Sequence, residues 1–429
     1  MSFAVSAIFL LFALLGAPLF AVIAAGALWG FHQQEVDLQV MAIEIYKLAE
    51  MPVLISIPLF TFAGYLLGES KAPQRLVRIT DALLGWMPGG LAIVALAACA
   101  LFTAFTGASG VTIVALGALL FPALSKAGYS EKFNLGLITT SGSLGLLFAP
   151  SLPLILYGIV AQQLALDIPV SIDDLFLAGI LPGSLMLLAL SIYSAIQPRD
   201  QVLAKENHHE FDLKEAIAAL KDSVWEIPLP FIVLGGIYSG LIAVSEAAAI
   251  TALYVLIVTV VIRREITFKT MPRVMSESMK LVGAIMVILA VSLASTNYMI
   301  DAEIPTQIFE FINSHIESKL AFLLLLTLFL LILGMMLDIF SAIVIMVPII
   351  LPIALEFGIH PIHLGIVFLA NMQLGYFTPP VGMNLFIASF RFNRPVMELY
   401  KATIPFFLIL LATVVVITYV PWLSLVFVD

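Results

Sequence analysis

"FTGASGVTIV", residues 105–114, interrupts a long apolar stretch with four small residues in succession. On either side run GGLAIVALAACAL (89–101) and IVALGALLFPAL (113–124), which have the composition of membrane helices. Small residues that end a helix expose backbone N–H and C=O groups, and each unsatisfied group costs several kcal/mol in hydrocarbon. The interruption must therefore be packed inside protein. We predict a segment at about 86–126 that enters the membrane and returns, with its tip at 107–110.

The composition of the whole chain is that of a polytopic membrane protein. Of 429 residues, 62% are hydrophobic and 11% are charged, and the mean hydropathy is +1.12. Repeated apolar runs reach about 20 residues, the length that spans a bilayer. These features exclude a soluble globular protein and predict an all-α fold. We expect crossings at about 3–30, 50–68, 133–162, 173–196, twice between 227 and 262, then at 276–300, 363–390 and 404–426, with a second returning segment at about 321–357.

The positions of Lys and Arg predict how the chain is oriented. With these crossings, one side collects all but two of the 19 Lys and Arg residues, and the other keeps Lys47 and Lys319. The positive-inside rule then places the basic side in the cytoplasm. The first returning segment would open from the cytoplasm and the second from outside. The N-terminus would lie inside and the C-terminus outside. The count does not separate re-entrant hairpins from full helix pairs, because both give the same parity.

The longest polar stretch, 198–226, lies between the two halves of the chain. Asp212 and Glu215 have the spacing of a capping box at the start of a helix. One apolar stripe follows them, formed by Leu213, Ala216, Ile217 and Leu220. We therefore expect a cytoplasmic linker whose amphipathic helix lies on the membrane surface.

Residues on either side of this linker form an internal repeat. Glycines and prolines match at one shift of 230 positions, namely Pro122 with Pro352, Gly128 with Gly358, Gly145 with Gly375 and Pro150 with Pro380. By the charge count the two copies enter from opposite sides, which is an inverted-topology repeat of the kind found in secondary transporters. We therefore expect a first repeat at 1–197 and a second at 227–429. Each would contain scaffold helices, a hairpin (86–126 or 321–357) and a broken helix (133–162 or 363–390).

Prolines near the middle of each broken helix predict where it breaks. LLFAPSLP (146–153) and YFTPPVGMN (376–384) contain prolines that lack the N–H needed to continue a helix. Freed carbonyls at such a break bind cations, whereas helix N-termini and hydroxyls bind anions. The predicted sodium ligands are Gly107, Ala108, Ser109, Gly110, Gly145 and Pro150 in the first repeat, and Asp338, Ser341, Gly375, Thr378 and Pro380 in the second. The predicted substrate contacts are Thr139, Ser141, Ser143, Ser151, Thr378 and Asn384.

Two alternatives to these sites remain open at the sequence level. The small residues at 107–110 also suit a close contact between helices. Asp338, between LFLLILGMML and IFSAIVIMV, is an acid in an apolar setting, which is costly unless it is paired or functional. Asp338 can also cap the helix that follows it, and capping is compatible with facing a cation. Coupling to protons through Asp338 is the alternative to sodium.

Other functional classes have weaker support. The chain lacks an HExxH motif, a P-loop lysine motif and a GxSxG elbow, so we expect no enzyme activity and no ATP drive within it. Breaks that approach from both sides suit an occluded site better than the open pore of a channel.

Three stretches resemble one known family, the large membrane subunits of TRAP (tripartite ATP-independent periplasmic) transporters. They are GIYSGLIAVSEAAA (236–249), GLITTSGSLGLLFAPSLPLILYG (136–158) and GYFTPPVGMNLF (375–386). The resemblance extends over essentially the whole chain. It implies a sodium-coupled importer of organic acids, such as C4-dicarboxylates or sialic acid, in the bacterial inner membrane. It also implies an elevator motion, in which hairpins and broken helices slide against a scaffold.

The same resemblance implies two protein partners. One is a soluble periplasmic binding protein that delivers the substrate. The other is a small four-helix membrane subunit, which we expect to be a separate polypeptide. No nucleic-acid partner is expected. The alternative is a stand-alone sodium/dicarboxylate symporter of related architecture, which would work without a binding protein.

Overall fold

The computed structural model describes residues 8–9, 11–12, 15, 17–87, 89–164, 166, 168–198, 212–239, 241–316 and 318–428. Within these ranges every regular element is a helix, as the sequence predicts. The part of the linker at 199–211 lies outside the described residues.

Among the described residues, the first half of the chain contains the nine helices α2 to α10 and two short 3-10 turns before the linker helix. They are α2 (Leu19–Gln33), α3 (Gln39–Ala49), η1 (Pro52–Ile55), α4 (Ser56–Glu69), α5 (Ala72–Leu84), α6 (Gly90–Thr106), α7 (Ser109–Lys126), α8 (Glu131–Ser141), η2 (Leu144–Leu147), α9 (Leu152–Gln163) and α10 (Ile172–Ala195), followed by α12 (Leu213–Asp222).

The second half follows the same plan. Its elements are α13 (Pro228–Tyr238), α14 (Val244–Leu256) with the π-helical turn η3 (Ile257–Ile262), α15 (Met271–Asp301), α16 (Ile304–Asn313), α17 (Lys319–Met336), α18 (Ile339–Glu356), α19 (Pro361–Gly375), α20 (Met383–Phe392), α21 (Val396–Tyr419) and α22 (Trp422–Leu425).

Among the described residues, eight helices are long and apolar enough to cross a membrane. A ninth candidate is the broken pair of α8 with η2 and α9, bent by 42°. One expected crossing is shorter than predicted. In the crossing that begins at 227, α13 has 11 residues, which at 1.5 Å per residue do not reach the roughly 30 Å of a hydrocarbon core. The first expected crossing, 3–30, lies partly outside the described residues, and its described helix α2 has 15 residues.

The two halves repeat each other at the predicted shift. Helices α7 and α18 begin and end 230 residues apart, at 109 and 126 in one and 339 and 356 in the other. Gly128 and Gly358 follow them, both with a positive φ, +84° and +68°. That backbone conformation favours glycine, which explains why this residue recurs at the turn.

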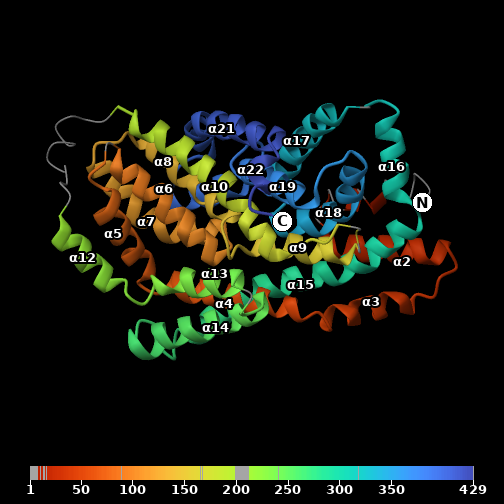
Figure 1. Cartoon of the computed structure of the whole chain (residues 1–429), viewed down its shortest axis with the longest axis horizontal. Helices are drawn as coiled ribbons and strands as arrows, with labels where there is room; N and C mark the ends of the chain where they lie inside the picture. Colours follow the sequence, from red (N-terminus) through yellow and green to blue (C-terminus); the bar gives the residue numbers. More distant parts are fainter. Residues whose placement is uncertain are drawn as a thin grey trace.

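The two repeats are interleaved, with α14 of the second packed on α4 of the first and α2 of the first packed on α15 of the second. Figure 1 shows α5 and α12 at one end and α16, the counterpart of α5, at the other, with the 31-residue α15 running between. Hairpin α6–α7 lies toward the first end and hairpin α17–α18 toward the second. The two hairpins therefore reach toward the middle from opposite ends.

Ion pairs join the segments that the charge count assigns to one basic face. Arg75 of α5 binds Glu226 and Glu265, Arg273 at the start of α15 binds Glu69 at the end of α4, and Arg394 binds Glu131. Because each pair joins segments distant in sequence, these ends of the helices lie together.

The linker helix α12 differs in detail from the expectation. Asp212 caps it, accepting a hydrogen bond from the Lys214 N–H at 2.8 Å, but Glu215 forms an ion pair with Arg78 of α5. The apolar stripe also divides. Ala216 is buried, because its small side chain lets α12 pack on α5, whereas Leu213, Ile217 and Leu220 are exposed. These three large side chains form the face available to the membrane surface.

Candidate functional site

Both hairpin tips line one cavity of about 770 Å³. The first tip contributes residues 107–111 and the second contributes residues 338–341. The opposite wall is built from α4 and α15, and Glu69, Glu277 and Lys280 lie among its lining residues. Two hairpins from opposite ends thus meet at one cavity, the arrangement expected of re-entrant hairpins.

The first tip packs on the break in its own repeat. Gly107 ends α6 with a φ of +64°, and a Cβ added there would lie 2.7 Å from the Leu152 side chain. Nearby, Thr103 Oγ1 donates a hydrogen bond to the Gly142 carbonyl at 2.9 Å. Gly145 packs so closely on α6 that a Cβ would lie 2.2 Å from the Ala100 carbonyl oxygen. Small residues thus serve the close contact, and the tip also borders the cavity.

The second repeat has the equivalent arrangement. Tyr376 Oη accepts a hydrogen bond from the Ile339 N–H at 2.7 Å, which ties the break to the second tip. The Gly382 N–H donates to the Met335 carbonyl at 3.1 Å. Gly375, the counterpart of Gly145, lies against the backbone of Gly334.

Adding a methyl group at Gly375 is expected to destabilise the protein. In Gly375→Ala the new Cβ would lie 2.4 Å from the Gly334 backbone, which cannot move as a flexible side chain could. Overpacking of this kind costs about 1–3 kcal/mol. Gly283→Ala is the matched control, since nothing lies within 4 Å of a Cβ there. The measurement is the temperature at which half of the purified protein aggregates. Equal values for the two variants would contradict the contact.

One contact crosses between the repeats. Ser109 Oγ at the first tip donates to Asn384 Oδ1 at 2.8 Å, and Asn384 Nδ2 donates to the Thr139 carbonyl at 3.3 Å. Asn384 is fully buried at the start of α20, the second part of the other broken helix. The sequence identified these three residues separately, and the structure brings them together.

Asp338 caps α18 and also lines the cavity. Its Oδ1 accepts from the N–H groups of Phe340 and Ser341 at 3.0 Å, and its Oδ2 accepts from Ser341 Oγ at 2.5 Å. The two roles considered for Asp338 are therefore geometrically compatible. The equivalent position in the first repeat is Ala108, which caps α7 without a side-chain hydrogen bond. The tips thus differ in charge, although their backbones match.

The predicted sodium ligands fall into two groups. Those at the tips line the cavity, namely Gly107, Ala108, Ser109, Gly110, Asp338 and Ser341. Those at the breaks do not line it, namely Gly145, Pro150, Gly375, Thr378 and Pro380.

None of the six predicted substrate contacts lines this cavity. Most of their hydroxyls bond back to their own helix, Thr139 to Leu135, Ser141 to Ile138, Ser143 to Thr140 and Thr378 to Leu374. Such back-bonding is the usual state of a helical hydroxyl. Ser151 differs, because its buried Oγ has no hydrogen-bond partner among the described residues.

The sequence reading missed several residues that form the other wall. Tyr65, Glu69, Glu277, Lys280 and Tyr376 all line the cavity. Those on α15 belong to one stripe with Leu281, Ala284, Ile285 and Ile288, at the i+3 and i+4 spacing of a helix face. That spacing could have identified this face of α15 from the sequence. Glu277 and Lys280, however, have the sequence context of a solvated helix end.

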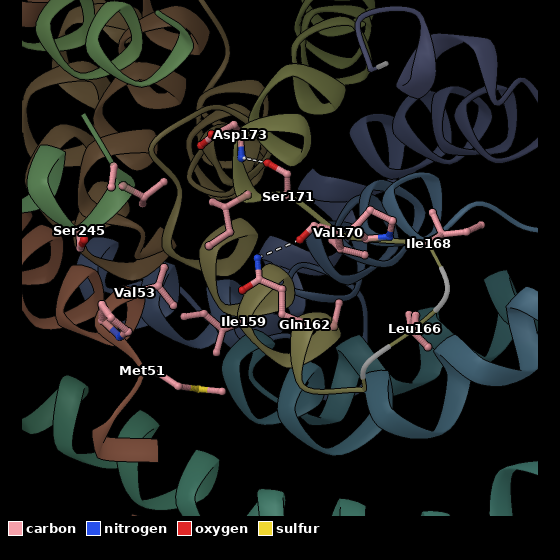
Figure 2. A pocket seen from close by; sticks show the side chains of 16 residues that line it. Met51, Val53, Ile159, Gln162, Leu166, Ile168, Val170, Ser171, Asp173 and Ser245 are labelled. Atoms are coloured by element: carbon pink, nitrogen blue, oxygen red, sulfur yellow. Dashed lines mark hydrogen bonds between the residues drawn. The ribbon is translucent and has the colours of Figure 1, made fainter. Parts of the chain in front are cut away.

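A second cavity of similar size, about 780 Å³, lies elsewhere (Figure 2). It is bordered by Met51, Val53 and Ser245, and by the loop in which Gln162 Nε2 donates to the Val170 carbonyl at 2.9 Å. Neither hairpin tip borders it. We therefore assign the candidate site to the cavity between the tips.

Comparisons with known proteins agree with this architecture. The family model described as "Tripartite ATP-independent periplasmic transporter, DctM component" matches residues 4–423. Among solved structures, the YdaH transporter of Alcanivorax borkumensis superposes with a TM-score of 0.65 at 15% identity, covering 98% of both chains. At that identity the likeness shows the fold alone.

Curated relatives differ in the substrates that their names give. The C4-dicarboxylate TRAP transporter large permease protein DctM of Pseudomonas aeruginosa is 34% identical, over 90% of this chain and 88% of that protein. The ectoine/5-hydroxyectoine large permease protein UehC of Ruegeria pomeroyi is 31% identical, over 96% and 95%.

A third relative, the isethionate TRAP transporter permease protein DctMQ of Oleidesulfovibrio alaskensis, is 33% identical over 96% of this chain. The chain spans 62% of the length of that relative. Both the family model and these relatives cover most of the chain. The chain therefore belongs to the family of tripartite ATP-independent periplasmic transporters, as a large permease subunit of the DctM type.

Proposed function

We propose that this permease imports an organic acid anion by symport with sodium. One observation carries the proposal, namely that two hairpin tips line a single cavity while each break packs against its own hairpin. Inverted repeats with interrupted helices supply both backbone carbonyls for cations and helix N-termini for anions. Relatives whose names give C4-dicarboxylate, isethionate and ectoine make a small organic acid the natural cargo class.

The sodium sites that we propose are formed by each tip with its own break. The first combines the tip at 107–110 with Gly145 and Pro150. The second combines Asp338 and Ser341 with Gly375, Thr378 and Pro380. Support comes from the close packing of each break on its hairpin, through Gly145 on α6 and Gly375 on Gly334. Carbonyl and hydroxyl oxygens held this way suit a hard cation.

We further propose that transport uses an elevator motion. The hairpins and broken helices would move together against α4, α15 and the other scaffold helices. The cavity lies between these two parts, which supports the division. Where they touch, Gly64 of α4 packs against the backbone at Thr106, and a Cβ there would lie 2.6 Å from the Thr106 Cα. A contact between small residues offers few interlocking side chains to a sliding surface.

The proposal includes location and partners. The basic face would lie in the cytoplasm of a bacterial inner membrane, with the N-terminus cytoplasmic and the C-terminus periplasmic. A periplasmic binding protein would deliver the substrate, and a separate small four-helix membrane subunit would sit beside this chain. The tripartite family description supports both partners.

The test is uptake by proteoliposomes that contain this chain with its small subunit. Labelled succinate, ectoine, isethionate, N-acetylneuraminate and 4-methyl-2-oxopentanoate are offered with and without the binding protein, under a sodium or a proton gradient. We expect uptake of at least one compound to require both sodium and the binding protein. Uptake that is the same with and without the binding protein would instead favour a stand-alone symporter. Uptake driven by protons without sodium would overturn the proposed sodium coupling.

A further inference from the structure

The walls of the cavity are mostly apolar. Beyond the tips, the lining includes Leu281, Ile285 and Ile288 of α15, and Phe340 and Met383 on the opposite side. A cargo with polar groups all around it would leave several of them unsatisfied against such walls, at roughly 1–3 kcal/mol each. The walls therefore fit a cargo with an apolar body.

Only one positive side chain lines the cavity among the described residues. Four charged groups border it, Glu69, Glu277, Lys280 and Asp338. Glu69 is already paired with Arg273, whose Nε also lies 4.0 Å from Glu277 Oε1. No described residue forms an ion pair with Lys280. Its ammonium group is thus the available partner for an acid group.

The hydroxyls at the tips are already committed as donors. Ser109 Oγ donates to Asn384, and Ser341 Oγ donates to Asp338. Among the described residues that line the cavity, the side-chain donors left besides Lys280 are the hydroxyls of Tyr65 and Tyr376, which carry no charge to balance a second carboxylate. Sodium ions at the tips would attract an acid group, but they would not supply the directed donors that a second carboxylate requires.

We propose that the cargo carries a single acid group on an apolar body, such as a branched-chain 2-oxo acid, and that Lys280 binds this acid group. The inference rests on the proposed transport function and narrows its substrate class. It assigns a role in specificity to α15, a helix of the scaffold side that carries none of the predicted site residues.

The test measures binding at the cavity directly in the complex of this chain with its small subunit. Ala284 lies on the lining stripe of α15 and is exposed. In an Ala284→Cys variant, a charged methanethiosulfonate reagent labels the cavity, while the native Cys99 is 1% exposed and stays protected. In the detergent-purified complex, the reagent and the probes can reach the protein from both of its membrane faces. The probes are 4-methyl-2-oxopentanoate, its uncharged amide, and succinate as a dicarboxylate of similar size.

We expect 4-methyl-2-oxopentanoate to slow labelling about fivefold at concentrations where succinate and the amide have little effect. Lys280→Gln should raise the concentration needed for half protection about tenfold, the scale of one lost charged contact. Lys280→Arg should retain protection. Lys221→Gln is the matched control, because this exposed lysine lies on α12, away from the cavity.

Equal or better protection by succinate would overturn the inference, as would unchanged protection in Lys280→Gln or no protection by any probe. The uptake assay with the unmodified chain is read separately. Sodium-driven uptake of a dicarboxylate, with no protection by 4-methyl-2-oxopentanoate, would keep the transport function and discard this substrate class. No sodium-driven uptake of any compound would count against the transport function itself.

Discussion

Replacing Asp338 by asparagine is expected to reduce sodium-driven uptake by about 100-fold while the protein remains folded. Asparagine still offers an oxygen to the N–H groups of Phe340 and Ser341, and it is among the best N-cap residues. The substitution removes the negative charge that borders the cavity. Loss of a charged contact worth about 3 kcal/mol corresponds to about 100-fold in cation affinity.

The control is Glu246→Gln. Glu246 is also an acid in an apolar sequence, and it caps α14 by accepting from the Ala243 N–H at 2.8 Å. It does not line the cavity, and glutamine can serve the same capping role. Uptake is measured against sodium concentration for both variants, with thermal stability as the check on folding. If uptake by Asp338→Asn depended on sodium as it does in the wild type, Asp338 would act only as a helix cap.

The repeat could be predicted from the sequence because its matching positions are glycines and prolines. These residues have backbone requirements that other residues cannot meet, so Gly128 and Gly358 mark the same turn in both halves. The hairpin tips were also readable, since small residues in an apolar stretch require burial within protein. Fold class and break positions follow from these local constraints.

The residues that line the cavity could not be predicted from the sequence in this way. Lys280 lines it because α15 turns that face toward the tips, and its sequence context is that of a charged helix end. The contact between Ser109 and Asn384 joins residues 275 positions apart, and only the packing of one repeat on the other creates it. The hydroxyls of Thr139, Ser141 and Ser143 bond to their own helix, as polar side chains in apolar helices most often do, and their contact with substrate stays a prediction.

Replacing Arg75 by methionine is expected to destabilise the protein by about 3 kcal/mol. Arg75 is 6% exposed, and its guanidinium binds Glu226 at 2.6 Å and Glu265 at 2.5 Å. Removing the arginine leaves two carboxylates in a buried site without their cation, and breaking buried pairs in this way costs about 3–5 kcal/mol. These contacts join α5, which leads into the first hairpin, to the segments before α13 and α15. Loss of the arginine should therefore also reduce uptake.

Arg78→Met is the matched control for this prediction. Arg78 lies on the same helix and also binds two carboxylates, Glu215 and Asp222, but its side chain is 44% exposed. Exposed ion pairs contribute little, because water solvates the separated charges well. The measurement is the thermal midpoint of each purified variant at neutral pH. If the two variants lost stability equally, burial would not be what makes the Arg75 cluster important.

The same cluster predicts how stability depends on pH. Burial opposes ionisation of Glu265, but hydrogen bonds from Arg75 and from the Lys71 N–H outweigh it and lower the pKa of Glu265 from its usual 4.5. A lowered pKa in the folded protein means that the contribution is complete above pH 4.5 and is lost as the pH falls below it. The difference in thermal midpoint between the wild type and Glu265→Gln should thus be largest near neutral pH and shrink below pH 4.5. A difference that grew with acidification would contradict the ionised pair, because protonation makes the two side chains alike.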